Sequence, residues 1–137
     1  MAQHMEKLTA TDRQPLKCFH VDGAGARPDG GGSGFAWVRL DKKEELIKRV
    51  DGLTNNVAEY RAVIAVLKYV SPGSTVLIQS DSQLVVQQVN GAWAVRDPNL
   101  AVHLSRVREF IEKKGLSITL RWIPRGENLA GKLLDRR

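Results

Sequence analysis

Three carboxylates lie where predicted secondary-structure elements begin or end. Asp22 follows the apolar run "LKCFHV", Asp81 follows "TVLIQS", and Glu59 lies in the first turn of a helix that opens with "TNNVAEY". Glu59 alone would also suit the positive end of a helix dipole. Acids that meet from distant parts of a chain repel one another and raise each other's pKa, so they need a cation among them. Their oxygen atoms favour hard divalent ions, Mg²⁺ first and Mn²⁺ as a substitute.

The elements that must position these acids follow the order β-β-β-α-β-α-α-β-α. Apolar runs and turn residues predict strands at 16–23, 33–41, 42–52, 75–81 and 116–124, and helices at 56–70, 82–91, 100–115 and 127–137. The closely spaced first strands favour an antiparallel meander, whereas strands separated by helices favour parallel pairing. The expected fold is α/β, a mixed sheet flanked by helices. If the first and fourth strands are parallel neighbours, Asp22 and Asp81 face one crevice at their carboxyl ends.

Composition narrows the class of protein. The 137 residues predict a tail at 1–15 and one domain at 16–137. A single cysteine, Cys18, excludes an intrachain disulfide and a cysteine-based zinc site, and fits a reducing, cytoplasmic setting. No apolar run is long enough to span a bilayer, so no membrane partner is expected. The net charge of +6 favours polyanionic partners. Nothing indicates an obligate protein partner, so a monomer is expected.

Four segments occur in register along the chain: "VDGAG", "TNNVAEY", "QSDSQLVVQQVNG" and "WIPRGENLAGKLL". Together they resemble type 1 ribonuclease H from about residue 17 to residue 135. The resemblance implies a five-stranded mixed sheet, with three antiparallel strands and two parallel ones. It implies endonucleolytic cleavage of the RNA strand of an RNA–DNA hybrid, with Asp22, Glu59 and Asp81 as the catalytic acids. Two Mg²⁺ ions about 4 Å apart would support in-line attack, leaving 5′-phosphate and 3′-hydroxyl ends.

The chain departs from the family at the start of the last helix. Relatives offer a fourth acid there, in a segment like R-x-x-N-x-x-A-D, and aligning the Arg and Asn places Lys132 at the acid. Three interpretations are open. Asn128 supplies a neutral amide oxygen to the metal, Glu127 or Asp135 supplies a carboxylate, or the site is damaged. We favour Asn128 as the fourth ligand. Its amide is neutral, so metal affinity would be weaker than with four acids, and activity would favour Mn²⁺ or higher metal concentrations. If Asn128 is not a ligand, it would cap the last helix.

The resemblance also implies residues that contact the hybrid. Short amides and backbone groups can distinguish RNA by its 2′-hydroxyls. The amides that match family positions contacting both strands are Asn55, Asn56 and Gln83, and the backbone expected to approach the RNA is that of Gly23, Ala24 and Gly25. Asn56 has the alternative of capping the helix, and Gln83 that of a solvated residue. Relatives place a loop histidine before the last helix; here Arg125 or Glu127 would take that role. His20 is expected to be a packed structural residue.

Two features of the sequence bear on how a substrate would be held. The segment 91–99 joins two helices directly, with one arginine, so the basic protrusion of many relatives is expected to be absent. Binding would then depend on dispersed Lys and Arg side chains and fall steeply with salt. The main alternative function is a domain of the same fold that binds hybrid or RNA without cutting it. A junction resolvase is a third possibility, although "TNN" and "SDSQ" favour hybrid cleavage.

Overall fold

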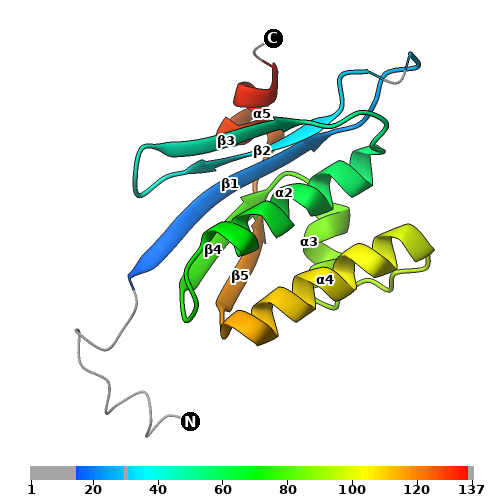
Figure 1. Cartoon of the computed structure of the whole chain (residues 1–137). Coiled ribbons are helices and arrows are strands. Elements are labelled where there is room, and N and C mark those ends of the chain that lie inside the picture. Colours follow the sequence, from blue (N-terminus) through cyan, green and yellow to red (C-terminus); the bar gives the residue numbers. More distant parts are fainter. Residues whose placement is uncertain (1–14, 30, 136–137) are drawn as a thin grey trace, which may run out of the picture.

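The computed structural model describes residues 15–29 and 31–135; most of the predicted tail at 1–15 therefore lies outside the described residues. The strands are β1 (Leu16–Ala24), β2 (Gly34–Arg39), β3 (Glu44–Arg49), β4 (Thr75–Ser80) and β5 (Ser117–Trp122). The helices are α2 (Asn55–Tyr69), α3 (Gln83–Val89), α4 (Pro98–Lys114), the 3₁₀ turn η1 (Arg125–Glu127) and α5 (Leu129–Asp135). The chain follows the predicted order of elements (Figure 1).

The strands form one mixed sheet in the order β3-β2-β1-β4-β5. The pairs β1–β2 and β2–β3 are antiparallel, and β1–β4 and β4–β5 are parallel. The predicted α/β fold with three antiparallel and two parallel strands is confirmed. In the β1–β4 register Val21 lies opposite Ser80. The next residues, Asp22 and Asp81, therefore lie side by side at the carboxyl ends of two neighbouring parallel strands.

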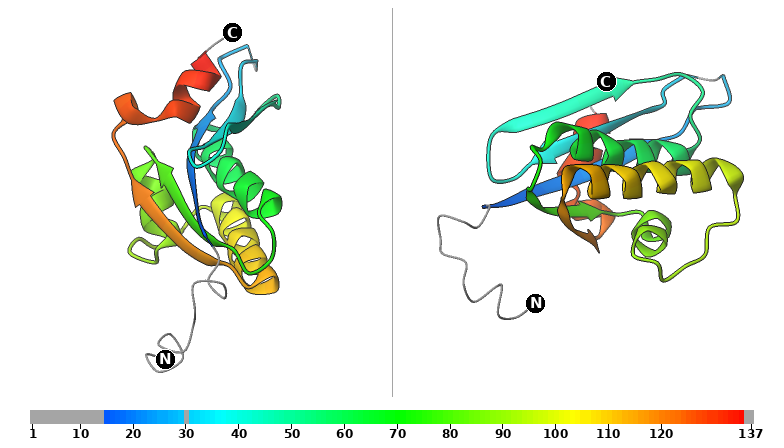
Figure 2. Two further views of the ribbon diagram at one scale, coloured as in Figure 1. Left: turned by 90° about the vertical axis from the view of Figure 1, so that its left-hand side faces the viewer. Right: turned by 60° about the horizontal axis from the view of Figure 1, so that its bottom comes forward.

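Helices cover both faces of this sheet. Figure 2 shows the sheet edge-on, with α2 and α4 on one side and α5 on the other. Strand alternation divides β1 between them, because successive side chains point to opposite faces. Phe19 and Val21 are fully buried in the main core with α2 and α4, whereas Ala130 and Leu134 of α5 form a smaller cluster with Ala36. Helix α5 therefore packs on the face that bears His20 and Asp22.

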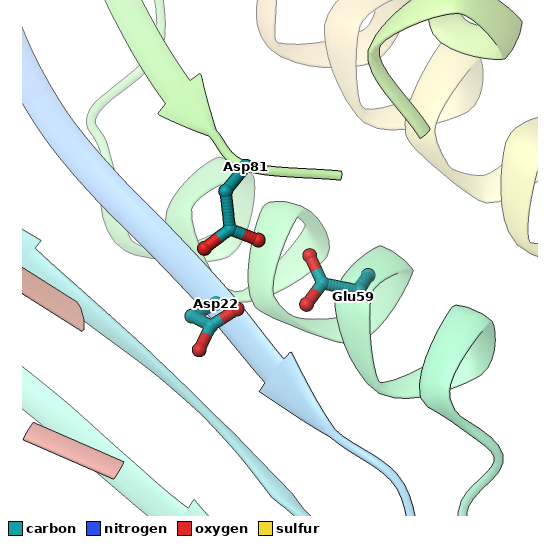
Figure 3. Close-up of side chains that lie close together, drawn as sticks. All are labelled: Asp22, Glu59 and Asp81. Atoms are coloured by element: carbon teal, nitrogen blue, oxygen red, sulfur yellow. The ribbon is translucent and has the colours of Figure 1, made fainter. Parts of the chain in front are cut away.

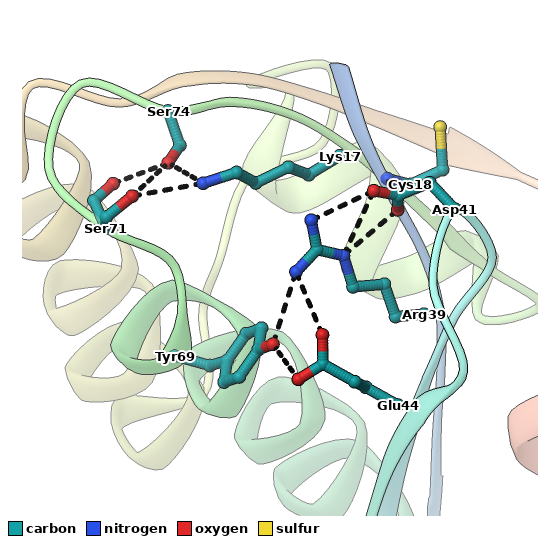
Figure 4. A network of polar contacts seen from close by, with 8 residues as sticks. All are labelled: Lys17, Cys18, Arg39, Asp41, Glu44, Tyr69, Ser71 and Ser74. Carbon is teal, nitrogen blue, oxygen red and sulfur yellow. Dashed lines mark hydrogen bonds and ion pairs between the residues drawn. The ribbon is translucent and has the colours of Figure 1, made fainter. Parts of the chain in front are cut away.

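The end of the sheet away from Asp22 is held by a buried arginine (Figure 4). Arg39 is 8% exposed and forms ion pairs with Asp41 at 2.9 Å and with Glu44 at 3.3 Å. Its guanidinium also donates to the Tyr69 hydroxyl at 3.2 Å, and that hydroxyl donates to Glu44. Hydrogen bonds to Asp41 raise the pKa of Arg39. A buried charge needs such partners, so this network joins β2, β3 and the end of α2 as a structural anchor.

In the part of the chain that the structure describes, no helix combines the length and the apolar character needed to cross a bilayer.

Candidate active site

Three acids from three elements meet at the carboxyl ends of β1 and β4. Asp22 is on β1, Asp81 follows β4, and Glu59 is on α2. Each offers an oxygen atom, and these atoms lie within 4.8 Å of one another. Figure 3 shows the three carboxylates pointing toward a common centre. The predicted meeting of the acids is confirmed, and no other group of three metal-ligating side chains occurs within residues 15–29 and 31–135.

Helix α2 reaches Asp22 because residue 23 is glycine. A Cβ atom on Gly23 would lie 2.2 Å from the carbonyl carbon of Ala58 and 2.3 Å from the backbone nitrogen of Glu59. No side chain fits in that gap. The Gly23 backbone N–H donates to Glu59 Oε1 at 2.9 Å and fixes the carboxylate. Glu59 is the fifth residue of α2, so it lies just beyond the first turn in which the sequence placed it.

Glycine 25 serves the same approach of the two elements. Its backbone N–H donates to Asn55 Oδ1 at 2.7 Å, and a Cβ atom there would lie 2.4 Å from that oxygen. The sequence interpretation assigned Gly23, Ala24 and Gly25 to close approach of an RNA strand. For Gly23 and Gly25 the missing side chain admits the start of α2, so packing within the chain requires both glycines. The approach of an RNA strand to this backbone stays a prediction.

Burial makes the ionised forms of two of these acids costly. Glu59 is 7% exposed and Asp22 is 4% exposed. Burial, followed by Asp22 and the charge of Asp81, raises the pKa of Glu59 to about 10. Burial also raises the pKa of Asp22, together with the charge of Asp81. Asp22 Oδ1 is buried and finds no hydrogen-bond partner among the described residues. An orphaned carboxylate oxygen among crowded acids fits a divalent cation with oxygen ligands.

Two neighbours that the sequence interpretation missed support the acids. Ser80 is fully buried, donates to Glu59 Oε2 at 3.4 Å, and accepts from the Ser82 backbone N–H at 3.0 Å. Trp122, at the end of β5, donates its indole N–H to the Asp81 backbone carbonyl at 3.2 Å. Ser80 directly precedes Asp81 in the sequence, and this adjacency could have identified it as a neighbour of the acids. Trp122 is 41 residues from Asp81, and no local pattern connects them.

Asn128 holds the site together in a way that the sequence interpretation did not favour. Its Nδ2 donates to the Val21 carbonyl at 2.8 Å and to Asp81 Oδ2 at 3.2 Å. Its Oδ1 accepts from the backbone N–H groups of Ala130 at 3.0 Å and Gly131 at 3.4 Å. The partners fix the amide orientation, because the first two only accept and the last two only donate. The expectation that Asn128 offers its oxygen to a metal is therefore corrected, and the capping alternative describes the structure.

The position that faces the acids from α5 is Gly131. A Cβ atom on Gly131 would lie 3.1 Å from Asp22 Oδ2, whereas Lys132 is exposed. The motif alignment, which placed the missing acid at Lys132, is thus one residue out of phase with the helix. Neither Glu127 nor Asp135 belongs to the acid cluster, and both are exposed. The helix position that faces Asp22 is thus a glycine, and within the described residues no fourth carboxylate joins the three acids.

His20 has the structural role expected of it. Its Nδ1 accepts the backbone N–H of Leu129 at 3.1 Å, which satisfies the first donor of α5. The ring is 8% exposed, and burial lowers the pKa of His20 while the charge of Glu127 partly opposes that shift. An accepting Nδ1 carries no proton, so the neutral ring is the form that holds α5.

The remaining predicted substrate residues lie at the starts of α2 and α3 and in η1. Thr54, not Asn56, caps α2 by accepting from the Val57 N–H at 3.2 Å, so the capping alternative for Asn56 is wrong and its side chain is exposed. Gln83 is exposed at the first position of α3, which Ser82 caps. Arg125 is exposed in η1, and its charge acts to lower the pKa of Asp22.

A family model described as RNase H matches residues 14–124. The chain belongs to the RNase H family. The match ends before η1 and α5, the segment in which this chain departs from the family's motif. Among solved structures, the N-terminal RNase H domain of Rv2228c from Mycobacterium tuberculosis is 29% identical, with a TM-score of 0.74 over 88% of this chain and 95% of that one. LC11-RNase H1, solved in complex with an RNA/DNA hybrid, is 28% identical, with a TM-score of 0.73 over 86% of this chain and 92% of that one.

The chain spans only part of the length of several curated relatives that it matches. The bifunctional protein Rv2228c of Mycobacterium tuberculosis is 38% identical over 82 residues, which cover 55% of this chain and 21% of that protein. Ribonuclease HI of Halobacterium salinarum is 33% identical over 128 residues, which cover 85% of this chain and 63% of that protein. The structure of the halobacterial enzyme has a TM-score of 0.74 with this chain. The part of this chain that the family model matches contains the three acids.

Proposed function

We propose that this RNase H family chain is a metal-dependent endonuclease that cleaves the RNA strand of RNA–DNA hybrids. The observation that carries the proposal is the convergence of Asp22, Glu59 and Asp81 within 4.8 Å, from two strands and a helix. The relative LC11-RNase H1 has been solved with an RNA/DNA hybrid, which supports the same class of substrate here. Affinity for the hybrid would come from a chain with a net charge of +6.

In this proposal the three acids hold the metal, with Mg²⁺ as the physiological ion and Mn²⁺ as a substitute. Bound divalent ions supply Lewis-acid activation of water and neutralise charge at phosphorus, and the expected products carry 5′-phosphate and 3′-hydroxyl ends. With its pKa raised to about 10, Glu59 would release a proton when it takes up a cation at neutral pH. Asn128 is a positioning residue: its Nδ2 orients Asp81 while its Oδ1 caps α5.

The hybrid would lie across the starts of α2 and α3, beside the acids. Asn56 and Gln83 are exposed there, and their amides can donate to and accept from 2′-hydroxyl groups. Asn55 has its Oδ1 engaged with Gly25, which leaves its amide nitrogen as the group offered to substrate. Backbone atoms of Gly23, Ala24 and Gly25 line the same edge. Arg125 would contact a phosphate close to the reacting bond.

One observation favours a second function, the binding of hybrid without cleavage. Gly131 faces Asp22 from α5 and offers no carboxylate, so the site has less negative charge to hold cations than a site with four acids. Against this alternative, a site with no metal would gain nothing from a buried, unpartnered Asp22 Oδ1 beside two more acids. Such crowding destabilises a protein unless a cation offsets it.

The deciding experiment offers end-labelled RNA–DNA hybrid, duplex DNA and duplex RNA of one sequence to the protein, with Mg²⁺, Mn²⁺ or EDTA. We expect cleavage of the hybrid alone, in the RNA strand, dependent on metal and abolished in Asp22→Asn. The matched control is Asp29→Asn, an exposed acid outside the cluster. Binding of the hybrid without cutting at any metal concentration would support the second function, and cleavage of duplex DNA would support a resolvase-like activity. We also propose a monomer, which light scattering tests directly.

A further inference from the structure

A groove separate from the acids runs between α2 and the edge strand β3. It has a volume of about 450 Å³ and receives side chains from β2, β3, α2 and α4. Its apolar lining consists of Phe35, Trp37, Leu46, Val50, Ile64 and Ala65. β3 is an edge strand, and its groove-lining residues Leu46 and Lys48 are half-buried and exposed, so this face of β3 is not fully covered. Asp22, Glu59 and Asp81 do not line the groove, which lies along the flank of α2 instead of at the strand ends.

Four cations surround this apolar lining: Lys48 on β3, Arg61 and Lys68 on α2, and Arg106 on α4. No Asp or Glu lines the groove. Within the described part of the chain, none of these four side chains forms an ion pair, in contrast to Arg39 and Lys113. The groove therefore combines an apolar interior with uncompensated positive charge at its rim.

One buried polar atom of the lining lacks a hydrogen-bond acceptor among the described residues. Trp37 is 4% exposed, and its indole nitrogen is buried without a hydrogen-bond partner among the described residues. Buried indole N–H groups normally find an acceptor, so this donor is available to an oxygen of a ligand if the ring shifts slightly. The Tyr69 hydroxyl, by contrast, is already engaged with Arg39 and Glu44.

We propose that this groove binds small organic anions that have an apolar body, such as aryl sulfonates or medium-chain carboxylates. The volume lies within the range of small-molecule sites, whose walls are mostly apolar with a few polar groups that orient the ligand. A nucleic-acid backbone fits less well, because it is polar along its whole length. Phe35 and Trp37 are 7% and 4% exposed, too little for a base to stack on them. This inference does not depend on the proposed nuclease activity.

The test uses 8-anilinonaphthalene-1-sulfonate as the probe, with the folded wild-type chain. We expect saturable binding of one equivalent with a Kd on the order of 10–100 μM, the range expected for a ligand of that size. Decanoate should displace the dye. In ¹⁵N-resolved NMR spectra the shifted amides should lie in β2, β3 and α2 around the groove. The absence of saturable binding up to about 1 mM, or shifts centred elsewhere, would overturn the proposal.

Two variants and a control locate the site. Arg61→Glu combined with Lys68→Glu should weaken dye binding at least about tenfold, since each reversal replaces attraction by repulsion. Ala65→Phe should block the groove sterically without changing charge. Lys42→Glu combined with Lys43→Glu changes the net charge equally at the exposed β2–β3 turn and should leave binding unchanged. An equal loss of dye binding in this control would show that net charge, and not the groove, determines the affinity, and would overturn the proposal. Displacement of the dye by hybrid, with equal weakening of hybrid binding in the groove double variant, would reassign the surface to nucleic acid.

Discussion

Asn128 donates its side-chain amide to Asp81 Oδ2 at 3.2 Å while the oxygen of the same amide caps α5. One fully buried side chain thus connects the last helix to the acid that follows β4. The orientation of Asp81 depends on the docking of α5, and α5 depends on the amide. Replacing this residue should change both stability and catalysis, even though the amide presents no free oxygen to a metal.

The first prediction concerns Asn128→Ala. The substitution leaves the Val21 carbonyl buried without its donor and removes the acceptor for two N–H groups of α5. We expect the free energy of unfolding to fall by about 2–4 kcal/mol, the sum of an orphaned buried acceptor and a lost cap. Hybrid cleavage should fall as well, because Asp81 loses its orienting donor. Urea unfolding and initial cleavage rates at saturating Mg²⁺ measure the two effects.

Asn128→Asp separates a positioning role from a metal-ligand role. A carboxylate retains the cap but faces the Val21 carbonyl and Asp81 with acceptor atoms only, so we expect lower stability and lower activity than in wild type. If Asn128 were instead a metal ligand, the added charge would tighten metal binding and lower the Mg²⁺ concentration required. A Mg²⁺ titration of cleavage by the Asp variant that shows this tightening would contradict the arrangement described here.

The second prediction tests the approach of α2 to β1 through Gly23→Ala. A Cβ atom would lie 2.2 Å from the backbone of Ala58, so α2 must move and carry Glu59 away from Asp22. We expect a loss of stability of about 1–3 kcal/mol, as for other overpacked sites, and loss of most hybrid cleavage. The control is Gly126→Ala in η1, where an added Cβ meets nothing within 4 Å. Retained cleavage in Gly23→Ala would show that Glu59 need not be held at this distance.

The sequence was sufficient to predict the sheet and the meeting of three acids, for identifiable reasons. Apolar runs mark β1 and β4. Because these strands are parallel neighbours, Asp22 and Asp81, which follow the paired residues Val21 and Ser80, lie at the same end of the sheet. The contact between Gly23 and Ala58 was not predictable, because nothing local to residue 23 reports what packs against it 35 positions later. The contact of Gly25 with Asn55 was not predictable for the same reason.

The register of α5 also depends on contacts that the motif does not contain. His20 accepts from Leu129 and Asn128 caps Ala130, so these two side chains fix where the helix begins and hence which residue faces Asp22. Motif spacing alone placed Lys132 at the acids. The structure places Gly131 there, because one residue changes the direction of a helical side chain by about 100°.

The third prediction concerns the pH dependence of the metal-free protein. The pKa of Glu59 is raised from 4.5 to about 10, chiefly by burial. Between those values the folded chain retains a proton that the unfolded chain releases, so the free energy of unfolding should fall as the pH rises through this window. Glu59→Gln removes the ionisation and should flatten the slope. Urea unfolding in EDTA at pH 6 and pH 9 measures it, with the exposed Glu109→Gln as control.

Added Mg²⁺ should reverse the same effect. A cation stabilises the ionised acids, so the wild-type chain should gain stability on addition of metal at pH 8, and Glu59→Gln should gain less. The variant should also lose hybrid cleavage by at least about 100-fold, the upper range for residues that merely support metal ligands. Equal stabilisation of the two proteins by Mg²⁺ would remove Glu59 from the metal site, whatever the effect on cleavage.

The fourth prediction compares Gly131→Asp with Lys132→Asp. A side chain at Gly131 starts 3.1 Å from Asp22 Oδ2 and would complete the acid cluster, whereas Lys132 is exposed. We expect Gly131→Asp to lower stability in EDTA, through repulsion among the acids, and to tighten Mg²⁺ or Mn²⁺ binding about tenfold. Tenfold is a cautious figure, since a unit charge about 4 Å away contributes about 4 kcal/mol at an effective dielectric of 20.

Gly131→Ala and Gly131→Asn separate the steric effect of a Cβ atom from the effect of charge, since neither adds a carboxylate. Isothermal titration with Mn²⁺ gives the affinities, and cleavage assays at limiting metal show whether activity follows them. Lys132→Asp should leave both the affinity and the stability in EDTA within about twofold and 0.5 kcal/mol of wild type, as for other exposed substitutions. Tighter metal binding in Lys132→Asp, with no change in Gly131→Asp, would contradict this arrangement. It would mean that residue 132, as the motif spacing predicts, faces the three acids, and that residue 131 does not.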